Sequence, residues 1–134
     1  MTQIIIYENS NNGVSVCRPT GELPIEEVLI KDCPSGAIIV DDSILPTGAD
    51  FQFFDAWELN GSTITVNFSK AKTIKLAQYN SATLAVAQNR QLNTLAGIPN
   101  DVSNADWQAK LIADRNSIAS STTTEELIKI NNPT

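Results

Sequence analysis

The 134-residue chain contains no histidine. Imidazole is the commonest general base in enzymes, the central member of Ser-His-Asp and Cys-His relays, and a frequent metal ligand. Glycine-rich phosphate-binding motifs and the nucleophile-elbow motif are missing as well. We therefore expect a protein that is not an enzyme and that holds no cofactor.

Long apolar runs and an excess of basic residues are also missing. No apolar stretch approaches the roughly 20 residues that a membrane-spanning helix needs, and the first residues lack the basic and apolar regions of a signal peptide. The formal net charge is −6, which disfavours capture of nucleic acid or of an anionic membrane. We expect a soluble protein made in the cytoplasm, with no nucleic-acid or membrane partner.

Cysteine is scarce. Cys17 and Cys33 are the only two, and their separation of sixteen positions fits neither a zinc-binding pattern nor the C-x-x-C redox motif. Because no signal peptide directs the chain to an oxidising compartment, we expect two buried free thiols rather than a disulfide.

Charge is divided unevenly along the chain. Residues 1–67 carry ten acidic and two basic side chains, whereas residues 68–134 carry five acidic and seven basic ones. Four of the six prolines also lie in the first half. The change in composition predicts two regions, a small β-rich domain over residues 1–68 and a helical region over residues 69–134.

The first region consists of strand-prone runs separated by turn residues. Strands are predicted at 4–7, 13–17, 37–40, 53–59 and 62–68. Pro24 suits the start of a helix and the two glutamates after it suit the positive end of the helix dipole, which predicts a short helix at 24–32. Asn60-Gly61 between two strand patterns is the strongest hairpin signal in the chain.

The second region is predicted to be helical. No proline or glycine interrupts residues 69–96, which predicts one long helix capped by Ser69 and ended by Gly97 and Pro99. Two shorter helices are predicted after it, at about 104–119 and about 124–130. The fold class is therefore α+β, a small antiparallel sheet with one short helix followed by a helical C-terminal half.

The long helix carries a stripe of side chains at three- and four-residue spacing, which is typical of a helix seam. Three of its seven members are polar, which predicts a modest, specific contact rather than a strong coiled coil. This candidate partner or oligomer face consists of Ile74, Ala77, Ser81, Leu84, Gln88, Gln91 and Leu95. In the alternative interpretation, the second predicted helix covers the stripe and leaves a monomer.

Four aromatic side chains lie within seven residues, namely Phe51, Phe53, Phe54 and Trp57. They form either part of a core or an exposed docking patch. In a strand, alternation places Phe53 and Trp57 on one face and Phe54 on the other. An aromatic on each face favours contact of one face with another protein.

Two charged groups each allow two interpretations. Asp41, Asp42, Asp55 and Glu58 form the densest carboxylate group, but they lack the spacing of a calcium loop, so we interpret Asp41 and Asp42 as turn and cap residues and expect no metal site. Lys70, Lys72 and Lys75 oppose the dipole of the long helix. They are either solvated or compensated by acidic groups of the first half or of a partner.

An ordered set of short segments in the first half resembles a known family. The segments are 4–7, 13–16, Pro19, 25–28, 31–36, 39–43, 45–46 and 54–58. In that order they resemble small tailed-phage and prophage proteins that are grouped with tail or tail-fibre assembly chaperones. The resemblance covers about residues 4–59. The chain departs from the family pattern at Cys33, where an aliphatic residue is expected, and by extra residues around 48–52.

The resemblance implies a non-enzymatic phage tail or tail-fibre accessory protein. Such a protein binds a tail-fibre or tail structural protein during assembly, in the cytoplasm of the bacterial host. One alternative is a resident structural component of the virion tail without a chaperone role, and another is a small metal-dependent enzyme that uses the aspartate group. Association of the helical half with a second copy of the chain is also open.

Overall fold

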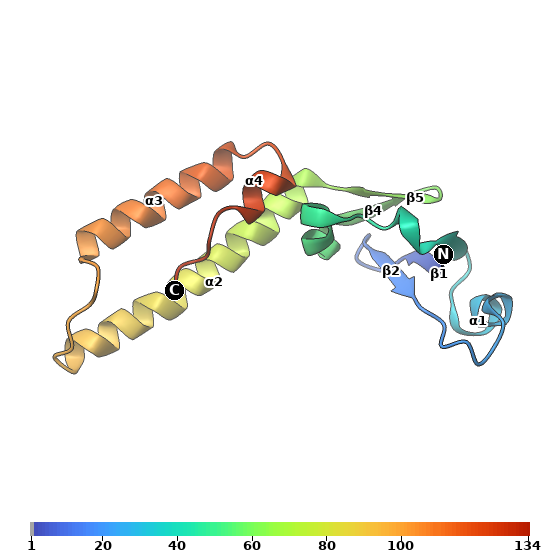
Figure 1. Cartoon of the computed structure of the whole chain (residues 1–134), viewed down its shortest axis with the longest axis horizontal. Coiled ribbons are helices and arrows are strands. Elements are labelled where there is room, and N and C mark those ends of the chain that lie inside the picture. Colours follow the sequence, from blue (N-terminus) through green and yellow to red (C-terminus); the bar gives the residue numbers. More distant parts are fainter. Residues whose placement is uncertain (1) are drawn as a thin grey trace. The chain divides into compact units, whose positions relative to one another are not determined.

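The computed structural model describes residues 2–134 and confirms the α+β fold class (Figure 1). Contacts within the chain divide it into two compact units, one ending at Asn67 and the other beginning at Phe68. The first unit contains all five strands of the described residues, and the second contains helices only. Each unit has its own packing.

A three-stranded antiparallel sheet forms the centre of the first unit. It consists of β1 (Gln3–Glu8), β2 (Val14–Cys17) and β3 (Ile38–Asp41), in the order β2-β1-β3. Because β1 is the central strand, its run of Ile4, Ile5 and Ile6 is fully buried.

The two faces of this sheet are covered by different elements. Ile4 and Ile6 form a buried cluster with Trp57, and the alternation of a strand turns Ile5 to the opposite face. The helix α1 (Ile25–Asp32) packs against β1 and β3. Since Ile5 is fully buried, α1 is the element that covers its face.

The loop between β1 and β2 is organised by one asparagine. The Asn9 side-chain oxygen accepts hydrogen bonds from the backbone N–H groups of Asn11 and Gly13, each at 3.0 Å. Asn12 takes a φ of 62°, a conformation that asparagine tolerates better than most residues. The loop covers residues 9–13 and is therefore longer than that of a two-residue hairpin.

The hairpin predicted at Asn60-Gly61 is confirmed, with its loop shifted by one residue. It consists of β4 (Trp57–Asn60) and β5 (Thr63–Val66). Asn60 pairs with Thr63, so the two loop residues are Gly61 and Ser62. Only Gly61 has a positive φ, of 61°, which matches the turn class that needs glycine at the first loop position.

The strand predicted over 53–59 is wrong in its first half. Residues Asp42–Ile44 (η1) and Gly48–Ala56 (η2) form 3-10 turns, and the second element is kinked at Phe53. The buried side chains of η2 and of the residue after it are Ala49, Phe53, Ala56 and Trp57. Ala56 and Trp57 lie three and four residues after Phe53, the spacing at which a helical turn places side chains on one side. A strand would turn Ala56 to the opposite face, so the observed burial fits helical turns and not a strand.

The second unit consists of three helices, α2 (Phe68–Leu95), α3 (Asn104–Ser120) and α4 (Thr124–Ile128). The long helix begins one residue before its predicted start, so Ser69 lies in its first turn and is not its cap. At the other end Gly97 has a φ of 74°. The N–H groups of Gly97 and Ile98 donate to the carbonyls of Thr94 and Asn93, which is the Schellman arrangement of a helix end.

Both shorter helices begin at hydroxyl caps. The Ser103 hydroxyl accepts the Asp106 N–H at 3.2 Å, and the Thr123 hydroxyl accepts the Glu126 N–H at 3.2 Å. α3 runs antiparallel to α2 and both α3 and α4 contact it (Figure 1). None of the helices within residues 2–134 combines the length and the apolar character needed to cross a bilayer.

Candidate functional site

Buried side chains of the second unit are concentrated at one end of its helical hairpin. They are Ala71, Lys75, Tyr79, Ile118, Ser121 and Leu127. Between residues 80 and 117, all of which the structure describes, no side chain is fully buried. We call residues 80–117 the outer hairpin. It comprises the C-terminal part of α2, the connecting loop and most of α3.

The stripe predicted on the long helix lies largely in this exposed part. Ile74 is half-buried, and the other six members are exposed. With 3.6 residues per turn, these six fall on roughly the opposite side of α2 from Ala71, Lys75 and Tyr79, which pack inside the unit. Leu84 is 61% exposed and Leu95 is 78% exposed, so α3 does not cover the stripe.

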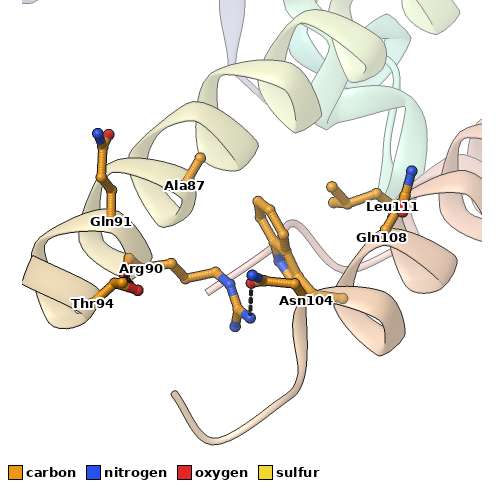
Figure 2. Close-up of a pocket in the computed structure, with 8 residues that line it drawn as sticks. Ala87, Arg90, Gln91, Thr94, Asn104, Gln108 and Leu111 are labelled. Carbon is orange, nitrogen blue, oxygen red and sulfur yellow. Dashed lines mark hydrogen bonds between the residues drawn. The ribbon is translucent and has the colours of Figure 1, made fainter. Parts of the chain in front are cut away.

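The exposed side of α2 carries no charge along most of its length. Residues 76–100 include a single charged residue, Arg90. Its guanidinium donates to the Asn104 side-chain oxygen at 2.7 Å (Figure 2). It also donates to the Val102 carbonyl at 2.7 Å and lies 4.9 Å from the centre of the Trp107 ring. The one charge of this stretch is therefore turned toward the α3 side and not toward the stripe.

We refer to the six exposed members of the stripe as the uncharged face of α2. They are Ala77, Ser81, Leu84, Gln88, Gln91 and Leu95. The cores of protein–protein interfaces are depleted of charged residues, because a charge must lose its hydration when the interface forms. The sequence pattern found this face by its spacing. The scarcity of charge over residues 76–100, where Arg90 is the single charged residue, is a second signal that the sequence offers in addition to the spacing.

Two hollows adjoin the uncharged face. A groove of about 400 Å³ between α2 and α3 is lined by Gln91, Arg90, Trp107 and Leu111, among others (Figure 2). The buried Nε atom of Arg90 has no hydrogen-bond partner among the described residues. A shallower hollow is lined by small side chains of α2, including Ala77 and Ser81. Small side chains let a second backbone approach closely, so both hollows extend the surface available to a partner.

Two of the three lysines at the start of α2 have hydrogen-bond partners within the second unit. The ammonium of Lys72 donates to the Ala119 carbonyl at 2.7 Å, in the last turn of α3, where cations stabilise a helix. Lys75 is only 6% exposed and donates to the Ile130 carbonyl. The interpretation of three solvated lysines is thus wrong for Lys75. Its spacing of four from both Ala71 and Tyr79 is the signal that could have revealed its burial.

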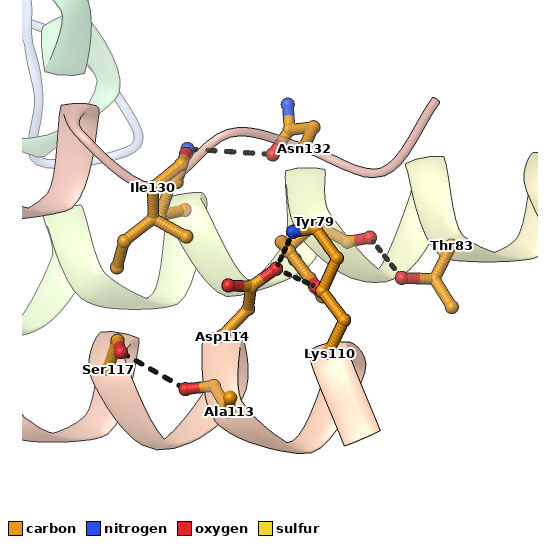
Figure 3. A network of polar contacts seen from close by, with 9 residues as sticks. Tyr79, Thr83, Lys110, Ala113, Asp114, Ser117, Ile130 and Asn132 are labelled. Atoms are coloured by element: carbon orange, nitrogen blue, oxygen red, sulfur yellow. Dashed lines mark hydrogen bonds and ion pairs between the residues drawn. The ribbon is translucent and has the colours of Figure 1, made fainter. Parts of the chain in front are cut away.

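A polar network joins α2 to α3 beside Lys75. The Tyr79 hydroxyl donates to the Asp114 carboxylate at 2.6 Å, and Lys110 contacts the same oxygen at 2.7 Å (Figure 3). Burial, followed by the hydrogen bond to Asp114, raises the pKa of Tyr79. Burial alone would raise the pKa of Asp114, but the hydrogen bonds from Lys110 and Tyr79 outweigh it and lower that pKa. Burial lowers the pKa of Lys75, and the charge of Asp114 partly opposes this.

The acidic group of the first unit is not gathered into one site. Asp41 accepts the Ser43 N–H at 2.8 Å and caps η1, and this bond lowers the pKa of Asp41. Asp42 lies 3.6 Å from the Arg18 guanidinium. Across residues 2–134 no cluster of three or more His, Cys, Asp or Glu side chains has the arrangement of a metal site.

The four candidate docking aromatics separate into two pairs. Phe53 and Trp57 are buried in the core of the first unit, whereas Phe51 is 60% and Phe54 43% exposed. The ring centres of Phe51 and Phe54 lie 6.1 Å and 4.7 Å from that of Trp57. Trp57 also donates its indole N–H to the Asp50 carbonyl at 2.9 Å. The exposed pair therefore rests on a fixed base and forms a second, smaller apolar surface.

Comparisons of the chain with protein-family models, with curated protein sequences and with solved structures found no match.

Proposed function

We propose that this chain is a non-enzymatic accessory protein of a tailed phage, which binds a tail-fibre or tail structural protein during assembly through the uncharged face of α2. The observation that carries the proposal is the exposure of that face. Leu84 and Leu95 project from a helix side that no other element of the second unit covers.

The packing of the outer hairpin supports a binding role. Helices in proteins gain most of their stability from tertiary packing of an apolar face rather than from propensity. The outer hairpin buries no side chain completely, and a polar helix without such packing is marginal in water. Contact with a partner would bury apolar side chains of the outer hairpin. Each Å² of apolar surface removed from water would stabilise the complex by about 25 cal/mol.

The character of the face indicates what kind of surface it fits. An uncharged face with leucines, small residues and two glutamines suits a partner surface that is itself uncharged and partly apolar. Side-chain amides such as Gln88 and Gln91 need hydrogen-bonding partners when they are buried, so they select among partners. The assignment of that partner to a phage tail or tail fibre rests on the resemblance of the first half.

The proposal is tested by co-expression with the tail and tail-fibre proteins encoded beside this chain. The tagged chain is purified from cells that make one such protein at a time, and the bound protein is identified by mass. Leu84→Glu places a charge at the centre of the uncharged face. The matched control is Ile112→Glu, since Ile112 is also exposed, at 54%, but lies on α3.

We expect wild type and Ile112→Glu to retain one of these tail proteins, and Leu84→Glu to lose it. Binding that survives Leu84→Glu, or the absence of binding to every tail and tail-fibre protein tested, would overturn the proposal. The same preparation distinguishes the finer roles. A chain absent from finished particles acts only in assembly, whereas a chain present in them is a resident component.

A further inference from the structure

We propose that Cys17 and Cys33 form an oxidisable thiol pair, which a small-molecule disulfide converts into an intramolecular disulfide that links the end of β2 to the end of α1. The two thiols are free in the structure, and each is half-buried rather than sealed in the core. The proposal concerns the first unit only and stands apart from the role of α2.

The strand register places Cys17 on the side of the sheet that α1 covers. Cys17 is the last residue of β2 and pairs with Ile5 on β1. Directly paired residues share a face, and Ile5 faces away from the cluster around Trp57. Cys17 therefore points to the same side as α1, not into the core between the two sheets.

The end of α1 brings the second thiol to the same place. Cys33 directly follows the helix as its C-terminal cap, in an extended conformation with φ of −115°. A cavity of about 250 Å³ is lined by Cys17 together with Val28 and Asp32 of α1, so the last turn of the helix faces Cys17. Cys33 follows Asp32 directly in the chain, so it lies beside this cavity, and Cys17 is close enough to raise the pKa of Cys33.

The chemistry balances with one molecule of a small disulfide such as oxidised glutathione. A thiolate of the pair attacks it, which forms a mixed disulfide and releases one glutathione. The second thiolate then attacks the protein sulfur of that mixed disulfide and releases another. Two protein thiols are oxidised, one glutathione disulfide is reduced, and the two thiol protons pass to the released glutathiones.

The environment of Cys33 sets the conditions for this exchange. Burial, followed by the proximity of Cys17 and Asp32, raises the pKa of Cys33. The thiolate is the reactive form, so the exchange is expected to be slow at neutral pH and to accelerate as the pH rises. The adjacent cavity between the end of β2 and α1 is lined by Cys17, which gives the oxidant a route to that thiol.

The test exposes the full chain to oxidised glutathione, alkylates the remaining thiols and measures the intact mass. We expect a product that is lighter by two hydrogen atoms and takes up no alkyl group. A cross-link restricts the unfolded chain, so the melting temperature should rise by about 5 °C or more and return after reduction. Cys17→Ser and Cys33→Ser are the controls, and each should give only a single glutathione adduct with no such rise.

The proposal is overturned by a wild-type protein that accumulates stable glutathione adducts or dimers linked between chains. It is equally overturned if the intramolecular bond forms but the melting temperature stays the same or falls, because the bond would then not fit the folded geometry.

Discussion

The two units of this chain differ in where their apolar residues go. In the first unit, apolar side chains of β1, β2 and β4 form one buried cluster around Trp57, and half-buried residues of β3, η1 and β5 pack against it. In the second unit, the buried residues lie at one end of the hairpin and include Lys75 and Ser121. The outer hairpin instead exposes Leu84, Leu92 and Leu95. The comparison shows that the first unit gathers apolar residues of several elements into one buried cluster, whereas the outer hairpin of the second unit leaves its leucines exposed.

The largest expected effect is in the first unit. Trp57→Ala should lower its free energy of unfolding by about 3–5 kcal/mol, because a fully buried indole is lost and a cavity remains. Denaturant unfolding followed by NMR, which resolves the two units, measures this loss. Phe51→Ala is the control and should cost less than about 1 kcal/mol, since Phe51 is mostly exposed. Equal losses for the two variants would mean that the cluster is not the core.

The second prediction concerns the polar network that joins α2 to α3 in the second unit. Tyr79→Phe removes the hydroxyl that donates to Asp114 and should cost about 1–2 kcal/mol. The loss is measured by denaturant unfolding followed by the helical signal in circular dichroism. Ser117→Ala removes an exposed hydroxyl of the same helix pair and should have a much smaller effect. A neutral Tyr79→Phe would show that the network contributes no stability.

The same network predicts a dependence on pH. The folded pKa of Asp114 lies below its unfolded value, so its contribution is fully present above about pH 4 and is lost as the pH falls through the folded pKa. The helical unit should therefore lose stability in acid. Asp114→Asn should remove that part of the pH dependence, as measured by melting temperature against pH. An unchanged profile in this variant would contradict the assignment.

The fourth prediction concerns the hairpin turn. Gly61→Val should destabilise the first unit by about 1 kcal/mol or more, because a β-branched residue resists the positive φ of this position. No side chain crowds the site, so the cost arises from backbone conformation alone. Ser62→Val is a matched control at the other loop position, which has no positive φ. Equal melting temperatures for Gly61→Val and wild type would show that the turn is misassigned.

The smallest effect on stability is expected on the uncharged face. Leu84→Glu should change the free energy of unfolding by no more than about 0.5 kcal/mol, as is usual for exposed positions. Circular dichroism and thermal melting of the purified chain check this. A large loss of helix would place Leu84 in an internal core and would remove the basis of the proposed function.

Much of the fold could be predicted from local signals. The isoleucine run of β1, the long stretch without glycine or proline in α2, and the caps at Ser103 and Thr123 each specify an element through short-range chemistry. The turns over Gly48–Ala56 could not be predicted in this way. Their aromatic residues suit a strand by propensity, and only the burial of Ala56 together with Phe53, three residues away, shows that strand alternation fails here.

The candidate site was predicted in part. The three-four spacing on the long helix located the stripe. Spacing alone does not say whether this stripe or the opposite side of the helix, with Ala71, Lys75 and Tyr79, faces inward. The answer depends on tertiary contacts of Lys75 and Tyr79, side chains whose polarity suggests a surface position. Long side chains bury their apolar parts when distant carbonyls and carboxylates satisfy their polar ends. Those partners, Ile130 and Asp114, are far away in the sequence.

The contrast between a first unit with a buried core and an outer hairpin that buries no side chain completely is tested most directly by hydrogen exchange. Backbone amides are followed in the free chain and in its complex with the protein that it retains in the co-expression experiment. The account predicts that amides of residues 80–95 exchange readily in the free chain and become strongly protected in the complex, while those of β1 are protected in both. Unchanged exchange over residues 80–95, with new protection around Phe51 and Phe54 instead, would contradict it.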